Sequence, residues 1–264
     1  MDIRKAFHQQ LEDITRDLVR MAAIVTESLP HVTEALLDGD LAEAQRLIDG
    51  DDLLDALTLE VEERCYRVLA LQNPMASDLR SIITAIRMAS EIERSGDLVS
   101  NIAKAARRIY GAELRPRLRG LIGQMGDEAT RLLRLAIDSY ADHDAALAAA
   151  LDDLDDRLDT VHHEFIEALF EERGDESLPL QVAVQMALIG RYYERIGDHA
   201  VNIGERVRYM VTGWLPEHTG AAREEAKRRG ALPGLDRATA PGADPLPEES
   251  EQPPPPGRSA APPT

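Results

Sequence analysis

Hydrophobic residues recur every three or four positions along the first 213 residues, which is the spacing of amphipathic helices. Clusters of Gly, Asn, Asp and Pro, which are typical of connections, interrupt this pattern. It predicts six helices, near residues 3–37, 41–72, 75–110, 116–141, 145–173 and 178–212. Pro30 falls inside the first helix, so we expect a bend or a local break there.

The patterns of the second and third predicted helices occur twice. Residues 38–63 align without gaps with residues 142–167 at an offset of 104, and the third helices align at an offset of 101 with the shared motif ER-x-GD-x3-NI. Such self-similarity indicates a structural repeat, and helices joined by short turns pack antiparallel. We therefore expect an all-α protein with two tandem homologous three-helix bundles, at residues 1–112 and 113–213, that form an elongated pair.

The composition changes after residue 213. Residues 214–264 hold eleven of the fifteen prolines and almost no apolar periodicity. Such a segment cannot bury enough apolar surface to offset the entropy lost on ordering, so we expect a disordered, Pro-rich tail.

Composition also narrows the classes of function. The formal net charge of -18 disfavours nucleic acid as a ligand, because that binding draws its affinity from clustered Lys and Arg, and it disfavours adsorption to an anionic membrane. No segment approaches the roughly 18 apolar residues that a membrane span needs, and the single cysteine cannot form an intramolecular disulfide. We therefore expect a cytoplasmic protein with no direct membrane insertion.

An acidic face interrupts the apolar stripe of the third helix in each half. Positions four residues apart share one side of a helix, and this spacing joins Glu93, Asp97 and Asn101, and again Glu194, Asp198 and Asn202. Apolar residues further back on the same faces are expected in the core: Leu79, Ile83 and Ile86, and Leu180, Val184 and Ala187. Like charges at this spacing destabilise a helix unless something positive compensates them.

The second helices carry carboxylates with the same spacing, Asp51 with Asp55 and Asp155 with Asp159. If these faces meet, four carboxylates converge in each half, and such hard oxygen donors suit Mg²⁺, Mn²⁺, Fe³⁺ or Zn²⁺. We therefore predict binding of metal ions, with the metal left open, by Asp51, Asp55, Glu93, Asp97, Asn101, Asp155, Asp159, Glu194, Asp198 and Asn202.

Two alternatives stay open for this face. It could be solvated, or it could be bridged by arginines, with Arg94 and Arg195 reaching another helix. His162 and His199 could add imidazole ligands in the second half, or they could be ordinary histidines at the surface or the edge of the core.

No catalytic machinery is evident in the sequence. None of the seven histidines has Glu three residues before it, as four-helix carboxylate oxidases require. No Gly-rich phosphate loop, Ser-His-Asp set or paired cysteine motif is present. We therefore expect that the protein is not an enzyme.

The motifs resemble the PhoU family of phosphate-transport regulators over about residues 3–213. The segments that carry the resemblance are IDGDDLLD in the second helix, NPMASDLR at the start of the third, EIERSGDLVSNIAK along it, and YYERIGDHAVNIGERV in the sixth. The resemblance implies two similar three-helix bundles, and it places the family's paired acidic sites, which in some members bind multinuclear metal clusters, on the eight carboxylates named above. The Pro-rich tail, Ser95 and Tyr192 depart from the family's pattern.

The resemblance also implies a cytoplasmic, usually dimeric adaptor. Such a protein links the ATPase of a high-affinity phosphate ABC transporter to a sensor histidine kinase, and it negatively regulates uptake and the phosphate-starvation response when phosphate is plentiful. Two other functions fit the residues. One is a metal-binding helical protein unrelated to transport, either a metal store or a metal-dependent enzyme, and the other is a purely structural helical protein.

Overall fold

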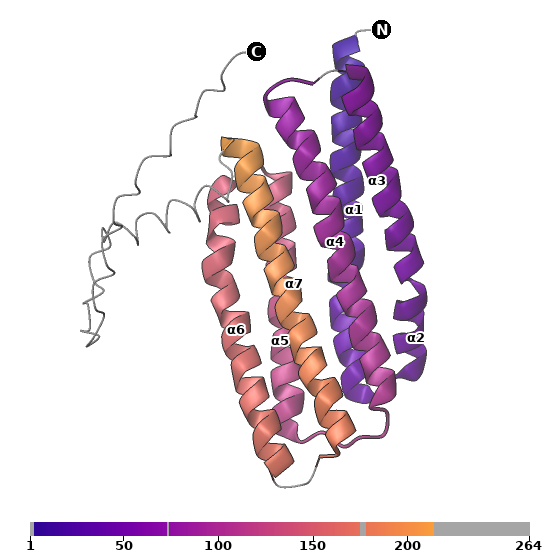
Figure 1. Cartoon of the computed structure of the whole chain (residues 1–264), viewed down its shortest axis with the longest axis vertical. Helices are drawn as coiled ribbons and strands as arrows, with labels where there is room; N and C mark the ends of the chain where they lie inside the picture. The colour runs from indigo at the N-terminus through magenta and orange to yellow at the C-terminus, as the bar shows by residue number, and fades with distance from the viewer. Residues whose placement is uncertain (1–2, 73, 175–177, 214–264) are drawn as a thin grey trace, which may run out of the picture. The chain divides into compact units, whose positions relative to one another are not determined.

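A computed structural model describes residues 3–72, 74–174 and 178–213, and over these residues it is helical with no strand. The helices are α1 (Ile3–Asp38), α2 (Leu41–Asp49), α3 (Asp51–Gln72), α4 (Ser77–Arg108), α5 (Pro116–Ala141), α6 (Ala145–Gly174) and α7 (Leu180–Thr212). The first repeat comprises α1 to α4 and the second comprises α5 to α7 (Figure 1). The duplicated all-α fold is confirmed, while the expected tail, residues 214–264, lies outside the described residues.

The second helix of each repeat begins in the same way. Asp40 accepts hydrogen bonds from two backbone N–H groups in the first turn of α2, at 2.9 and 3.0 Å. Asp144, which is 104 positions later, accepts the corresponding two bonds at the start of α6, also at 2.9 and 3.0 Å. A carboxylate there satisfies N–H groups that have no partner inside the helix. The repeat seen in the sequence therefore includes its helix caps.

The prediction of one helix at 41–72 is wrong. The structure divides this segment at Gly50 into α2 and α3. Glycine has a low helix propensity, and the Asp51 and Asp52 side chains that follow are stabilised at the positive end of a new helix. In the second repeat the aligned position is Leu154, which lies within the uninterrupted α6.

The first helix tolerates its proline. Of the bend or local break expected at Pro30, the break is not seen, because α1 continues through the proline from Ile3 to Asp38. A proline removes one backbone hydrogen bond inside a helix. Its neighbours Leu29 and Val32 are completely buried, so packing against the core supports the helix on both sides of the proline.

The last helices of the two repeats, α4 and α7, lie against each other. In Figure 1, α6, α7, α4 and α3 follow one another side by side, with α1 and α5 behind them. Arg80 Nε, near the start of α4, donates to the carbonyl oxygen of Met210, near the end of α7, at 3.2 Å. One turn further along α4, Thr84 Oγ1 donates to the carbonyl oxygen of Arg206 at 3.3 Å. The two helices are therefore antiparallel neighbours along the seam between the repeats.

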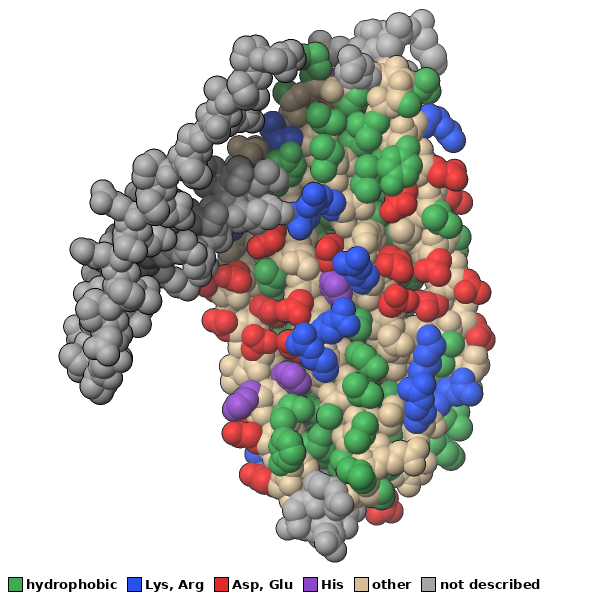
Figure 2. Space-filling model, in the orientation of Figure 1, with side chains coloured by type: hydrophobic (Ala, Val, Ile, Leu, Met, Phe, Trp, Pro, Cys, Tyr) green, Lys and Arg blue, Asp and Glu red, His purple; other side chains and the backbone are tan. Residues whose placement is uncertain are grey.

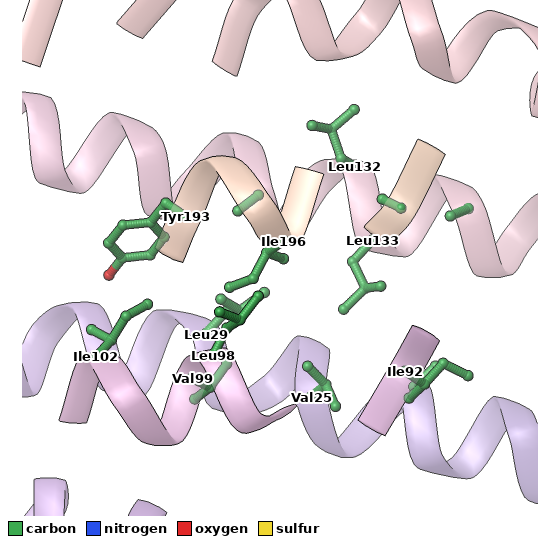
Figure 3. Close-up of a cluster of buried hydrophobic side chains, with 14 of the residues drawn as sticks. Val25, Leu29, Ile92, Leu98, Val99, Ile102, Leu132, Leu133, Tyr193 and Ile196 are labelled. Atoms are coloured by element: carbon green, nitrogen blue, oxygen red, sulfur yellow. The ribbon is translucent and has the colours of Figure 1, made fainter. Parts of the chain in front are cut away.

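Both repeats contribute to one hydrophobic core. Figure 3 shows buried side chains from four helices packed together: Val25 and Leu29 of α1, Ile92, Leu98, Val99 and Ile102 of α4, Leu132 and Leu133 of α5, and Tyr193 and Ile196 of α7. A buried hydrogen bond of 2.8 Å also joins the hydroxyl groups of Thr33 in α1 and Tyr193 in α7. The described residues belong to a single compact unit, and no described helix is long and apolar enough to cross a membrane.

Candidate functional site

Acidic side chains form a belt across the face made by α6, α7, α4 and α3 (Figure 2). Basic side chains lie among them, and apolar ones lie above and below. The eight predicted carboxylates come from these helices: Asp51 and Asp55 on α3, Glu93 and Asp97 on α4, Asp155 and Asp159 on α6, and Glu194 and Asp198 on α7. The first repeat therefore supplies one pair from α3 and one from α4, and the second supplies one from α6 and one from α7.

In the first repeat the structure brings the two pairs together. Burial, followed by the charges of Asp97 on the same helix and Asp55 on α3, raises the pKa of Glu93 above its ordinary value. Burial, with the charges of Asp97 and Asp55, also raises the pKa of Asp51, although a neighbouring hydroxyl group and Lys104 act in the opposite direction. The four carboxylates therefore lie close enough for their charges to interact, and Lys104 and Arg94 oppose part of this negative charge.

Asp155 has the most perturbed carboxyl group of the second repeat. Burial, followed by the charges of Asp159 and Asp198, raises the pKa of Asp155 to about 7. Its Oδ1 atom is buried with no hydrogen-bond partner among the described residues. The Oε2 atom of Glu194 is in the same position, while its Oε1 atom pairs with Arg191. The negative charge of this face is therefore only partly compensated.

Gly96 and Gly197, the glycines of the repeated GD dipeptide, let α4 approach α3 closely and α7 approach α6 closely. A Cβ atom at Gly197 would lie 2.3 Å from Asp155 Oδ1, and a Cβ atom at Gly96 would lie 2.2 Å from Leu54 Cδ2. Carbon atoms cannot occupy such positions in a close-packed interior without displacing their neighbours. The small residue therefore precedes the acidic position in both repeats for a reason of packing.

The donor atoms suit a hard metal ion, but the side chains are not arranged as a finished site. His162 on α6 has a buried Nε2 atom without a partner in the described structure, and burial, followed by Arg191, lowers the pKa of this imidazole. A neutral imidazole and carboxylate oxygens are common metal ligands. Within residues 3–72, 74–174 and 178–213, however, no three His, Cys, Asp or Glu side chains stand close enough together to hold a metal. Ligation would therefore require side chains such as Asp155 and Glu194 to rotate.

Arg191 belongs to the acidic face of the second repeat, although the sequence did not predict it as part of that face. This residue pairs with Glu194 on the same helix, and its second terminal nitrogen lies 3.9 Å from Asp198 Oδ2. The spacing of three residues between Arg191 and Glu194 is a signal that could have revealed the pair. Arg94 and Arg195, which one alternative took as possible bridges to another helix, are exposed.

A buried polar contact joins the repeats across the α4–α7 seam. His199 Nδ1 donates to Glu91 Oε2 at 2.7 Å, and Asn202 Nδ2 donates to the same oxygen at 3.2 Å. Burial alone would raise the pKa of Glu91, but these two hydrogen bonds, together with the charges of His199 and Arg94, outweigh it and the pKa is lowered. Asn202, a predicted metal ligand, therefore contacts Glu91 in this structure, and Asn101 is half-buried at the equivalent position of α4.

The two partners of this contact, Glu91 and His199, lie at positions where the two halves have different residues. At an offset of 101, Glu91 aligns with Tyr192 and His199 aligns with the buried Leu98. Glu91 on α4 and His199 on α7 each differ from the aligned residue of the other repeat. These two differences were the signal that could have revealed the pair. The sequence had drawn attention to Tyr192 and His199 separately, and neither was connected with Glu91.

Part of the predicted apolar stripe is not in the core. Leu180 and Val184 on α7 are 64% and 50% exposed, and Leu79 on α4 is 37% exposed. The remaining predicted positions, Ile83, Ile86 and Ala187, are half-buried. The prediction is wrong for the exposed residues because the buried stripe of α7 follows another side of the helix, through Met186, Ile189 and Tyr193.

The fold and the two acidic faces define a class of internally duplicated, all-helical proteins with a carboxylate cluster on each repeat. The chain belongs to the PhoU family, since the family model described as the PhoU domain matches it twice, at residues 18–106 and 122–207.

Relatives match most of the chain. The "Phosphate-specific transport system accessory protein PhoU homolog 1" of Mycobacterium tuberculosis is 34% identical over 215 residues, which are 81% of this chain and 96% of that protein. A protein of Pseudomonas putida with the name "Phosphate-specific transport system accessory protein PhoU homolog" is 32% identical and covers 91% of this chain and 94% of its own length. The crystal structure of PhoU from Pseudomonas aeruginosa has a TM-score of 0.75 and 30% identity, covering 79% of this chain and 100% of that chain.

Removing the charge of Asp155 should stabilise the metal-free protein at high pH. Its pKa of about 7 in the folded state exceeds the ordinary value of 3.8, so between these values the folded protein binds more protons than the unfolded chain, and the free energy of unfolding falls as pH rises. We expect Asp155→Asn to be more stable than wild type in EDTA at about pH 8 and indistinguishable below about pH 4, with a slope of at most about 1.4 kcal/mol per pH unit. Urea unfolding at several pH values measures this difference.

The control for this experiment is Asp153→Asn, which changes an exposed carboxylate on the same helix. Equal effects of the two substitutions would show that the pH dependence reflects the overall charge and not the buried group.

The contact across the seam predicts a second outcome. His199→Leu, which introduces the residue found at the equivalent position of the first repeat, leaves Glu91 with Asn202 as its remaining donor. We expect the free energy of unfolding to fall by about 1–3 kcal/mol at neutral pH. Because the pKa of Glu91 is lowered in the folded state, the contact stabilises above the ordinary carboxyl pKa of 4.5, and the loss should shrink as the pH falls below that value.

Denaturation of His199→Leu, Glu91→Gln and the double variant measures this coupling. His163→Leu, at an exposed position of α6, should change stability by less than about 0.5 kcal/mol. Strict additivity of the two substitutions at the contact would count against it.

Proposed function

We propose that the chain is a cytoplasmic, homodimeric regulator of phosphate uptake. In this proposal it acts as an adaptor between the ATPase of a high-affinity phosphate ABC transporter and the sensor histidine kinase of the phosphate-starvation response. When phosphate is plentiful, it restrains uptake and keeps that response off.

Family membership along both repeats carries the proposal. The Mycobacterium tuberculosis relative is named an accessory protein of the phosphate-specific transport system, and the chain covers 96% of it. A solved structure from Streptococcus pneumoniae, with 26% identity and a TM-score of 0.73, is described as a phosphate transport system regulatory protein. The agreement of these descriptions supports a role in phosphate transport that is accessory and not enzymatic.

The surface supports an adaptor. Leu180, Val184 and Leu188 follow one another at four-residue intervals along α7 and are 64%, 50% and 38% exposed. Contiguous exposed apolar residues on a folded protein are typical of interaction sites. In Figure 2, apolar side chains of this face lie on both sides of the acidic belt, so a partner could contact apolar and charged side chains together.

We also propose that metal ions, either Fe, Zn, Mn or Mg, bind the two acidic faces. Asp51, Asp55, Glu93 and Asp97 would hold a metal in the first repeat. Asp155, Asp159, Glu194 and Asp198 would hold one in the second, with His162 close by. The unpartnered buried oxygen atoms and the raised pKa of Asp155 support a cation there. A bound cation would supply positive charge that links the second helix of each repeat to the third.

Metal binding can be measured directly. We expect the EDTA-treated chain, after dialysis against each metal in turn, to retain at least one of them in stoichiometric amount by elemental analysis. At 100 times the dissociation constant the bound metal should add about 2.7 kcal/mol to the free energy of unfolding. The double variant Asp155→Asn, Asp198→Asn should lose the metal of the second repeat, whereas Asp153→Asn should keep it; equal retention in both variants would refute the assignment.

The regulatory role has a separate test in the organism that encodes the chain. Removing the chain should switch on a phosphate-starvation reporter in phosphate-rich medium, to the level seen in phosphate-poor medium, because the proposed restraint is lost. Supplying the wild-type chain should switch the reporter off again, and a tagged chain should co-purify with the transporter ATPase and the kinase. A reporter that stays off after removal would sink the proposal, whatever the metal content.

A further inference from the structure

A cavity of about 170 Å³ lies in the first repeat where α2 gives way to α3. Aliphatic side chains from three sides line it: Ile24 and Val25 of α1, Leu47 and Leu54 beside the junction, and Val99 of α4. Asp51, the first residue of α3, also lines the cavity. The cavity is therefore mainly apolar with a carboxylate at one side.

The break at Gly50 places this cavity in the first repeat. Gly50 is itself part of the lining, and it has no side chain with which to fill the space. The residue aligned with it in the second repeat is Leu154, whose side chain packs against the hydrophobic core from the uninterrupted α6. The cavity thus accompanies a local difference between two otherwise similar halves.

The volume limits what can bind. An engineered protein cavity of about 150 Å³ holds a benzene molecule, which has six heavy atoms. Sites for nucleotides and other larger ligands usually enclose about 300–1,000 Å³. A group of about six heavy atoms therefore fits this cavity, which is partly open to solvent.

The charges that face the cavity favour a cation. Arg46 lines it but pairs with Glu43 on the same helix, so the two charges largely offset each other. Asp51 is half-buried, which disfavours its charged form, and Asp55 and Asp97 add negative charge nearby, whereas the Ser100 hydroxyl and Lys104 act in the opposite direction. A ligand with a positive end could form a charge-assisted hydrogen bond with this half-buried carboxylate in the lining of the cavity.

We propose that the cavity binds a short alkylammonium ion, with its hydrocarbon chain against Ile24, Leu47 and Leu54 and its ammonium group at Asp51. The site is independent of the proposed role in phosphate regulation. It shares Asp51 with the proposed metal face of the first repeat, and it differs from that face in requiring an apolar chain on the ligand.

Three probes of similar shape and different charge test the proposal: 3-methylbutylammonium, 3-methylbutanol and 3-methylbutanoate. We expect saturation-transfer NMR titrations of the full chain in EDTA to give a dissociation constant for the ammonium at least about tenfold lower than for the alcohol, because a hydrogen bond to a charged group adds to apolar burial. The carboxylate should not bind. Equal binding of all three probes would overturn the assignment of Asp51.

Two substitutions test separately how the hydrocarbon part and the charge of the ligand contribute to binding. Gly50→Leu should abolish binding of the ammonium and the alcohol by filling the cavity. The backbone at Gly50 is right-handed helical, with φ of -77°, and an added Cβ would lie no closer than 3.5 Å to neighbouring atoms, so the variant should fold. Asp51→Asn should bring the affinity for the ammonium down to that for the alcohol.

The matched control is Asp155→Asn, which removes one carboxylate from the second repeat and should leave the binding of all three probes unchanged. Circular dichroism confirms that each variant is folded. Retention of ammonium binding in folded Gly50→Leu, or its loss in Asp155→Asn, would show that the probe binds the acidic surface and not the cavity.

Discussion

The antiparallel contact between α4 and α7 is the constraint on which the rest of the structure depends. Arg80 lies against Met210 and Glu91 against His199, so equal steps in opposite directions along the two helices meet near Ser95 and Arg195. This register brings the acidic motifs of both repeats to one level, which is why Figure 2 shows one belt and not two separate patches. The same contact places apolar residues of both halves in one core.

Much of this arrangement could be predicted from residue spacing. The offsets of 104 and 101 predicted the repeat, and the four-residue spacing of carboxylates predicted which helix faces would be acidic. Both predictions depend on helical periodicity, which is a local property. The breaks were harder to predict. Gly50 and the acidic residues after it are a local signal for the start of α3, whereas the continuity of α1 through Pro30 is supported by the burial of Leu29 and Val32, which the local sequence does not show.

The differences between the halves carry information that the repeat itself does not. Arg191 pairs with Glu194 in the second repeat, while its equivalent in the first is Ser90, and the cavity beside Gly50 has Leu154 at the aligned position. The two acidic faces are therefore chemically unequal despite their common motif. The pair of Arg191 and Glu194 could have been predicted from its three-residue spacing on one helix, but the cavity depends on how side chains of separate helices meet, which periodicity does not reveal.

The contact between Glu91 and His199 also determines which helix can lie beside which. A chain made of two similar halves could in principle pair like with like, α4 of one copy against α4 of another. In that register Glu91 would face Leu98 and lose the imidazole as its partner, at a cost of about 1–3 kcal/mol. In an α7–α7 pair His199 would face Tyr192 in place of the carboxylate of Glu91. The contact between Glu91 and His199 therefore favours pairing of α4 with α7 over pairing of α4 with α4 of a second copy.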